Sequence, residues 1–325
     1  MIKPSITSSA PGKLMLLGEH AVVYGHPCIV TAVDQRIQVS VRKNGVDVFH
    51  MDAPDLGLTA YSKTICDLGK KELPKGVRFV ELLYRRFLDQ YPQKEGIVVT
   101  TKSDFADTFG FGSSSAVTVA FAKALTTLYN LNLTNKQLFD LCYQAVLDVQ
   151  GVGSGFDLAA AIWGGTLYYI PPAKVVTKLK VNHLPLVVGY TGIKADTPTL
   201  VRMVAGLKDT KPRLITSIFK NINHLVEAAV VSINQSDWTG LGDLFNQNQQ
   251  LLKQLGVSST ELDRLIQSSL KAGSAGAKLS GAGGGDCMIA TYQYDQSKSH
   301  IESAITAVGG QVMPVVLNAP GVRVE

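Results

Sequence analysis

The sequence has no long hydrophobic run and few cysteines. Its 325 residues include four cysteines, which are widely spaced and lack the paired spacing of metal ligands, namely Cys28, Cys66, Cys142 and Cys287. We interpret them as free thiols. No apolar segment approaches the roughly 18 residues that cross a bilayer, and the first residues lack the apolar core of a secretory signal. We therefore expect no membrane association and predict a cytoplasmic location.

Runs of like charge, internal repeats and low-complexity segments are absent as well. The net charge of +5 is spread over the whole chain. This distribution slightly favours small anionic ligands and gives no reason to expect nucleic acid. With 46% hydrophobic and 18% charged residues, the chain can bury one large core or two medium ones. It is predicted to be a folded globular protein.

The hydrophobic pattern predicts an α+β protein. Apolar segments predict strands in the first third of the chain, at residues 14–18, 28–33, 36–41 and 96–101. Apolar residues at helical spacing predict helices over 77–91, over 113–129 and from Thr134 onward, with capping boxes at 134–137 and 258–261. Residues 277–292 predict a strand, a glycine loop and a second strand, before a helix and a closing strand. The β-rich first part and the helix-rich second part are expected to join near residue 190.

Glycine and serine gather directly before one predicted helix, in the sequence FGFGSSS at 109–115. A helix N-terminus carries unpaired N–H groups and a partial positive charge, and glycines let a phosphate approach the backbone. The segment therefore predicts a phosphate-binding loop, while a plain turn capped by Ser113 or Ser114 remains an alternative. It is not a Walker loop, because no Lys-Ser/Thr pair follows the second glycine. Ser115 stands where the dinucleotide pattern requires a third glycine.

Two further segments combine glycine or polar residues with apolar flanks: PGKLMLLGEHAVVYG at 11–25 and KLSGAGGGDCMIA at 278–290. Together with 109–115 they resemble the motifs of the GHMP kinase superfamily, from about residue 8 to the end of the chain. Within that superfamily, GEHAVVYG most specifically resembles mevalonate kinases. The resemblance implies a two-lobed α+β fold with an N-terminal ATP-binding domain over 1–190, a C-terminal domain over 191–325 and an active site in the cleft.

The same resemblance implies that the protein phosphorylates mevalonate, with ATP and Mg²⁺ as cofactors. It places the ATP phosphates on the glycine-serine loop, at Gly110, Gly112, Ser113, Ser114 and Ser115, with Ser114 also at the metal. The glycine motif that contains Gly281 and Gly283 is expected to brace this loop and the substrate. A homodimer is compatible with the resemblance, although the sequence does not determine the oligomeric state.

Asp157 and Lys13 match the catalytic aspartate and the companion lysine of the family. The carboxylate of Asp157 would position and deprotonate the acceptor hydroxyl. A nearby ammonium would keep that carboxylate ionised. For Asp157 the alternative is a helix N-cap. Lys13 lies within an apolar strand pattern, where an ammonium needs a partner or an anion.

Glu19, His20 and Thr197 match positions that contact the acceptor in mevalonate kinases. Glu19 is expected to orient the imidazole of His20 or a substrate hydroxyl, with a buried structural histidine as the alternative. Thr197 follows Asp196 and would serve equally well as a helix N-cap.

Three positions depart from the pattern of mevalonate kinases. Val146 occupies the place of their acidic Mg²⁺ ligand, so that either Asp148 replaces it or Ser114, the phosphates and water hold the metal. The segment GVGSGFD lacks their usual proline, and Asp286 follows the glycine motif; both features resemble phosphomevalonate kinases. Phosphomevalonate therefore remains an alternative acceptor, and a catalytically inactive, metabolite-sensing member of the family is the alternative from another functional class. The presence of Lys13, Ser114 and Asp157 together favours the kinase.

Overall fold

A computed structural model describes residues 4–70, 72–104 and 110–325 of the chain. Its first lobe is built on an eight-stranded sheet with the order β12-β1-β2-β5-β3-β4, in which β6 pairs with β2 and with β7. The strands are β1 (Ser5–Leu17), β2 (Cys28–Lys43), β3 (Val48–Ala53), β4 (Leu58–Thr64), β5 (Ile97–Ser103), β6 (Thr166–Ile170), β7 (Val175–Lys178) and β12 (Arg323–Val324). The helices of this lobe are α1 (Arg78–Gln90), α2 (Ser113–Leu128), α3 (Asn135–Gln150) and α4 (Phe156–Trp163), with short 3₁₀ turns η2 (Pro54–Leu56) and η3 (Ile65–Asp67).

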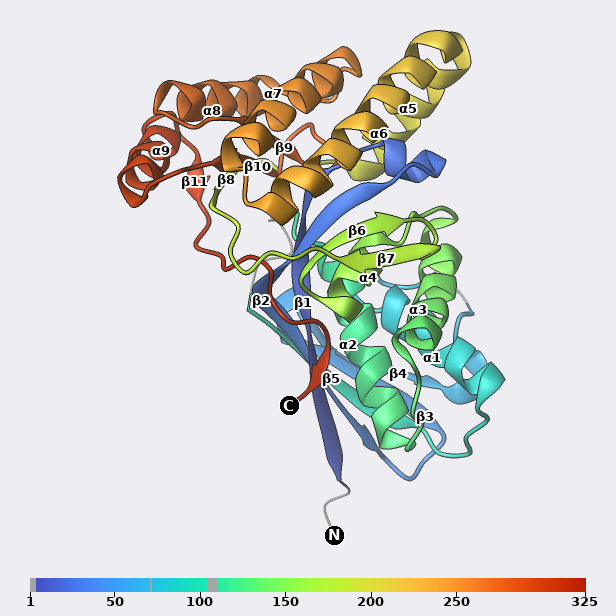
Figure 1. Cartoon of the computed structure of the whole chain (residues 1–325). Helices are drawn as coiled ribbons and strands as arrows, with labels where there is room; N and C mark the ends of the chain where they lie inside the picture. Colours follow the sequence, from blue (N-terminus) through green and yellow to red (C-terminus); the bar gives the residue numbers. More distant parts are fainter. Residues whose placement is uncertain (1–3, 71, 105–109) are drawn as a thin grey trace.

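The second lobe carries a smaller sheet of four strands with the order β11-β8-β10-β9. These strands are β8 (Leu186–Tyr190), β9 (Ala277–Ser280), β10 (Cys287–Thr291) and β11 (Gln311–Val312). Its helices are α5 (Thr197–Thr210), α6 (Pro212–Gln235), α7 (Trp238–Gln254), α8 (Thr260–Lys271) and α9 (Asp295–Ala307). Figure 1 shows the two groups of elements at opposite ends of the molecule, with β1 and β2 extending from the first lobe toward the second. The α+β architecture predicted from the sequence is confirmed.

The structure corrects the predicted division of the chain at residue 190. Strand β8 pairs with β10 and β11, so residues 186–190 already belong to the second sheet. At the other end, β12 pairs with β1, and Leu317 and Pro320 form isolated bridges with Val33 and Gly164. The last residues therefore return to the first lobe, as the red C-terminal trace beside β5 shows (Figure 1). A single cut in the sequence does not separate the two lobes.

Local signals predicted most helix ends but not all. The capping box at Thr134 is confirmed, since its hydroxyl accepts from the backbone N–H of Gln137 and the Gln137 side chain reaches back. The second predicted capping box, at 258–261, is wrong. The N-cap of α8 is Ser259, and the hydroxyl of Ser258 instead donates to Asp263. The two strands predicted at 28–33 and 36–41 are one strand, β2.

Helix α2 occupies the centre of the first lobe. Ten of its sixteen residues are buried, including Ala116, Val119, Ala120 and Phe121, which are fully inaccessible. It packs on β1 and β2 on one side and against α3 and α4 on another. Small residues let it approach the sheet closely. Its N-terminus is therefore held rigidly against β1, where the predicted phosphate-binding loop lies.

Candidate active site

The predicted phosphate-binding loop ends in a helix N-terminus that no side chain caps. Helix α2 starts at Ser113, and its N-cap is Gly112 in the left-handed region, at φ 75°. The alternative in which Ser113 or Ser114 caps the helix is therefore not what the structure shows. By contrast, Thr134 caps α3 with its hydroxyl. An uncapped helix start with glycine before it suits an anion.

Lys13 is tied to this loop at two points. Its backbone N–H donates to the carbonyl of Phe111 at 2.9 Å, and its Nζ donates to the carbonyl of Gly110 at 2.9 Å. The register of the β1–β2 pair shifts between Pro11 and Lys13, and such bulges redirect side chains. A Cβ at Gly12 would lie only 3.0 Å from the oxygen of Phe111, so β1 and the loop are in close backbone contact. The ammonium predicted to need a partner has one.

Asp157 lies in the first turn of α4 and faces the same loop. Ser115 donates its hydroxyl to the Asp157 carboxylate, and Asp157 Oδ1 accepts from the N–H of Leu158 at 3.0 Å. The N-cap of α4 is Gly155, which rules out the N-cap interpretation of Asp157. A Cβ at Gly112 would lie 3.2 Å from Lys13 Cε and 3.9 Å from Asp157 Cβ. The structure therefore brings Lys13, the loop and Asp157 together around Gly112.

His20 connects the first motif to the glycine motif of the second lobe. Its ring Nε2 lies 2.9 Å from the carbonyl oxygen of Ala282, between Gly281 and Gly283. The side chain is buried, and burial lowers the pKa of His20 below its ordinary value, so that the imidazole is neutral near pH 7. The backbone of His20 adopts φ 59°, an unfavourable conformation for a residue with a side chain. The geometry brings His20 and the glycine motif together, and its contact with an acceptor stays a prediction.

The interpretation of Glu19 as a substrate contact is corrected by the structure. Its side chain is 0% exposed and forms an ion pair with Lys278, which is equally buried. The other carboxylate oxygen accepts from Asn248 Nδ2 at 3.0 Å. Both oxygens of Glu19 are thus bound within the protein rather than directed to the imidazole of His20 or to a ligand.

Thr197 is the first residue of α5 and is exposed. The N-cap of that helix is Asp196, whose carboxylate accepts from the N–H of Thr199 at 3.2 Å. The N-cap alternative for Thr197 is therefore wrong by one residue. Its role near the acceptor remains a prediction.

Asp286 lies against the phosphate-binding loop, although it is not among the site residues predicted from the sequence. A Cβ at Gly110 would lie 2.6 Å from Asp286 Oδ2, and Asp286 Oδ1 accepts from the N–H of Ala195 at 2.9 Å. Burial raises the pKa of Asp286, while the N–H of Ala195 and the positive charges of Lys13 and Lys194 act in the opposite direction. The only signal in the sequence was its place directly after the glycine motif.

The residues around the loop fit Mg²⁺ with few protein ligands. Val146 is buried on α3, and the Asp148 carboxylate is bound by two nitrogens of Arg86, with Nη2 at 2.6 Å from Oδ1. Asp148 is therefore not the replacement ligand. Within the described ranges, no group of three or more His, Cys, Asp or Glu side chains could hold a metal ion. Ser114 and Asp157 remain, and Mg²⁺ readily keeps waters and phosphate oxygens as its other ligands.

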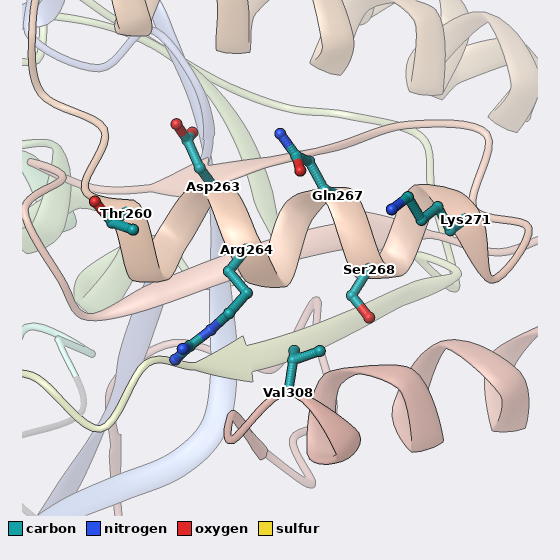
Figure 2. A pocket seen from close by; sticks show the side chains of 7 residues that line it. All are labelled: Thr260, Asp263, Arg264, Gln267, Ser268, Lys271 and Val308. Carbon is teal, nitrogen blue, oxygen red and sulfur yellow. The ribbon is translucent and has the colours of Figure 1, made fainter.

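A cavity of about 510 Å³ lies on α8 of the second lobe and is lined by Thr260, Asp263, Arg264, Gln267, Ser268, Lys271 and Val308. Figure 2 shows Arg264 and Ser268 on the side of α8 that faces Val308, whereas Asp263 and Gln267 extend from the other side of the helix. Its polar groups do not converge on one point. None of its lining residues belongs to the predicted site.

Comparisons with known proteins identify the family of the chain. The model of the GHMP kinase N-terminal domain matches residues 77–165, and that of the GHMP kinase C-terminal domain matches residues 229–311. The matches fall in both lobes, and the chain belongs to the GHMP kinase family. Among the residues that the structure describes, no helix is long and apolar enough to cross a membrane.

Within the family, the chain is most informatively compared with mevalonate kinases. It is 35% identical to the mevalonate kinase of Thermococcus sibiricus over 335 aligned positions, which cover 98% of each chain. The structure of L. major mevalonate kinase in complex with R-mevalonate superposes with a TM-score of 0.77 at 26% identity, covering 96% of this chain and 95% of that one. Phosphomevalonate kinase of Streptococcus pneumoniae shares the fold, with a TM-score of 0.79 at 19% identity over 96% and 99% of the two chains.

Proposed function

We propose that this protein is a mevalonate kinase, which transfers the γ-phosphoryl group of ATP to the primary hydroxyl of mevalonate. The observation that carries the proposal is the convergence of Lys13, Asp157 and the uncapped start of α2 around Gly112. It occurs in a chain whose relatives, aligned over nearly their whole length, are mevalonate kinases. The free thiols, three buried and one exposed, suit a reducing compartment such as the cytoplasm.

In this proposal the chain contributes positioning and one proton acceptor. The N–H groups at the start of α2 bind phosphate oxygens. Asp157 accepts the proton of the acceptor hydroxyl as its oxygen attacks the γ-phosphorus, and the bond from that phosphorus to the bridging oxygen breaks to release ADP. Ser115 holds the Asp157 carboxylate in place through its hydroxyl. Lys13, anchored on the carbonyl of Gly110, places a positive charge beside the site of proton transfer.

Mg²⁺, when bound with ATP, neutralises charge on the phosphate oxygens. We assign Ser114 as its ligand from the protein. Replacing Ser114 with alanine is expected to weaken metal binding by about tenfold, since Val146 supplies no compensating carboxylate. Titration of Mn²⁺ into the protein with a non-hydrolysable ATP analogue, followed by electron paramagnetic resonance, measures this affinity directly. Ser299→Ala, on α9 of the second lobe, is the control and should bind the metal as the wild type does; equal loss in both variants would contradict the assignment.

The charges around the site favour mevalonate over phosphomevalonate. A second phosphate brings a charge of about −2 and needs several cationic or N–H donors. Lys278, the cation nearest the glycine motif in the sequence, is fully buried and paired with Glu19. Asp286 places a carboxylate against Gly110 of the loop. Both features make a doubly anionic acceptor less favourable than one with a single carboxylate and neutral hydroxyls.

We therefore expect kcat/KM for mevalonate to exceed that for phosphomevalonate by about tenfold or more. A coupled assay of ADP release, run with both acceptors and with homoserine and galactose, measures the ratio. A higher value for phosphomevalonate would move the assignment to the alternative acceptor and leave the kinase chemistry standing. Turnover with none of these acceptors, despite tight ATP binding, would favour the inactive, metabolite-sensing alternative.

A further inference from the structure

A fully buried ion pair joins the two lobes next to His20, a residue predicted to contact the acceptor. Glu19, in the segment that follows β1, pairs with Lys278 of β9, and both side chains are 0% exposed. Asn248 of α7 donates to the second oxygen of Glu19 at 3.0 Å and is itself inaccessible. We refer to Glu19, Lys278 and Asn248 as the interlobe clamp. It connects three segments that are far apart in the sequence.

Stability alone explains the interlobe clamp poorly. Burial raises the pKa of Glu19 and lowers that of Lys278, and their mutual attraction only partly offsets this effect, so burial disfavours the charged form of both groups. Buried pairs of this kind are often no more stabilising than apolar side chains of the same volume. In addition, Oδ1 of Asn248 is buried without a hydrogen-bond partner among the described residues. A buried polar atom without a partner lowers the stability of the fold. The interlobe clamp is therefore better explained by the geometry that it imposes than by a gain in stability.

The immediate neighbours of the interlobe clamp include His20 and the glycine motif, which are predicted to contact the acceptor. His20 follows Glu19, has the unfavourable φ of 59° and lies 2.9 Å from the carbonyl of Ala282 through its Nε2. Ser280, two residues after Lys278, donates its hydroxyl to the carbonyl of Met15 in β1 at 2.8 Å. Strain of this kind persists only where the surroundings hold the residue in place. The clamp anchors the chain on both sides of the contact between His20 and the glycine motif.

We propose that Glu19, Lys278 and Asn248 are positioning residues, which hold His20 and the 281–285 glycine turn in the arrangement that receives the acceptor. The directional ion pair fixes the distance between β9 and the segment after β1. Apolar side chains in the same place would allow that distance to vary. The clamp affects acceptor binding rather than ATP binding, because its residues contact the segments 11–25 and 278–290 and do not contact the N-terminus of α2. The assignment of mevalonate as this acceptor rests on the function proposed above.

The decisive variant replaces both charges with side chains of similar length, Glu19→Met/Lys278→Met. No charge is left unpaired, although Asn248 loses its acceptor on Glu19, so the protein is expected to fold with a Tm lowered by several degrees. We expect KM for mevalonate to rise by about tenfold or more while KM for ATP stays within about twofold. Asn248→Leu keeps the ion pair and removes one bond to Glu19, so its KM for mevalonate should rise by about threefold.

Lys63→Met/Glu81→Met is the matched control. It removes another ion pair with one fully buried partner, which lies in the first lobe at 2.8 Å. The control should lower Tm without changing either KM. Equal rises in KM for mevalonate and ATP, or a KM for mevalonate within twofold of wild type in the folded variants, would overturn the proposal. If the double replacement does not fold, Asn248→Leu decides by the same criterion.

Hydrogen exchange gives a readout that needs no substrate. In both variants, peptides covering 18–25 and 281–286 should exchange faster than in the wild type, while peptides of β2 and β5 remain unchanged. Unchanged exchange in the first two peptides would contradict the positioning role. If the wild type phosphorylates another acceptor, the proposed function is refuted but the positioning role is not. The variants are then compared by their KM for that acceptor and by hydrogen exchange.

Discussion

Asp157→Asn is expected to lower kcat by about a hundredfold or more and to leave the affinity for ATP close to that of the wild type. The amide keeps the size of the side chain and still accepts from the Ser115 hydroxyl, but it cannot take the proton of the acceptor. Among the described residues, Asp157 contacts the start of α2 only through the hydroxyl of Ser115. It does not itself bind the phosphates, so the affinity for ATP should be retained. Steady-state kinetics with mevalonate and calorimetry with ATP separate the two effects.

Asp148→Asn is the matched control for this change, since Asp148 is also an aspartate of the first lobe but is paired with Arg86. It should retain wild-type kcat. Lys13→Met should resemble Asp157→Asn, and the double variant should be little worse than either single one, because both residues act on the same proton. An Asp157→Asn enzyme within a few fold of wild-type turnover would refute the assignment of the proton acceptor.

The features that the sequence predicted and the structure reproduces are those with local signals. The glycine-serine loop adjoins its own helix, and the hydroxyl of Thr134 caps a helix within three residues. Lys13 was assigned through its motif, and an ammonium inside an apolar strand already required a partner. The structure supplies that partner in the carbonyl of Gly110.

The parts that were missed depend on contacts between distant segments. Glu19 and Lys278 are 259 positions apart, and nothing in either segment shows that they neutralise each other. Asp286 reaches Gly110 only because β10 begins beside the phosphate-binding loop. Strand β2 was predicted as two strands because Asp34 and Gln35 interrupt its apolar pattern. These residues fall where the pairing with β1 shifts register, so the strand bulges there instead of ending.

Gly112→Val is expected to abolish detectable ATP binding. The residue has φ 75°, a region that a β-branched side chain essentially never adopts. Its Cβ would lie 3.2 Å from Cε and 3.3 Å from Cγ of Lys13, so the side chain would displace the ammonium from Gly110. The same atoms would occupy the space through which a phosphate approaches the helix start. Calorimetry with Mg·ATP measures the loss, and circular dichroism verifies the fold.

A variant at a second glycine, Gly256, distinguishes the effect of backbone strain from obstruction of the site. Gly256 has nearly the same φ, 74°, and a Cβ there would meet nothing within 4 Å. Gly256→Val therefore carries the same conformational cost, of order 1–3 kcal/mol, without touching Lys13 or the loop. It should lower Tm about as much as Gly112→Val and still bind ATP with wild-type affinity. If Gly112→Val binds ATP normally, the segment is only a turn between strand and helix; if both variants lose binding, strain transmitted through the fold explains the loss. Loss of binding in Gly112→Val alone would assign the phosphate contact to this loop.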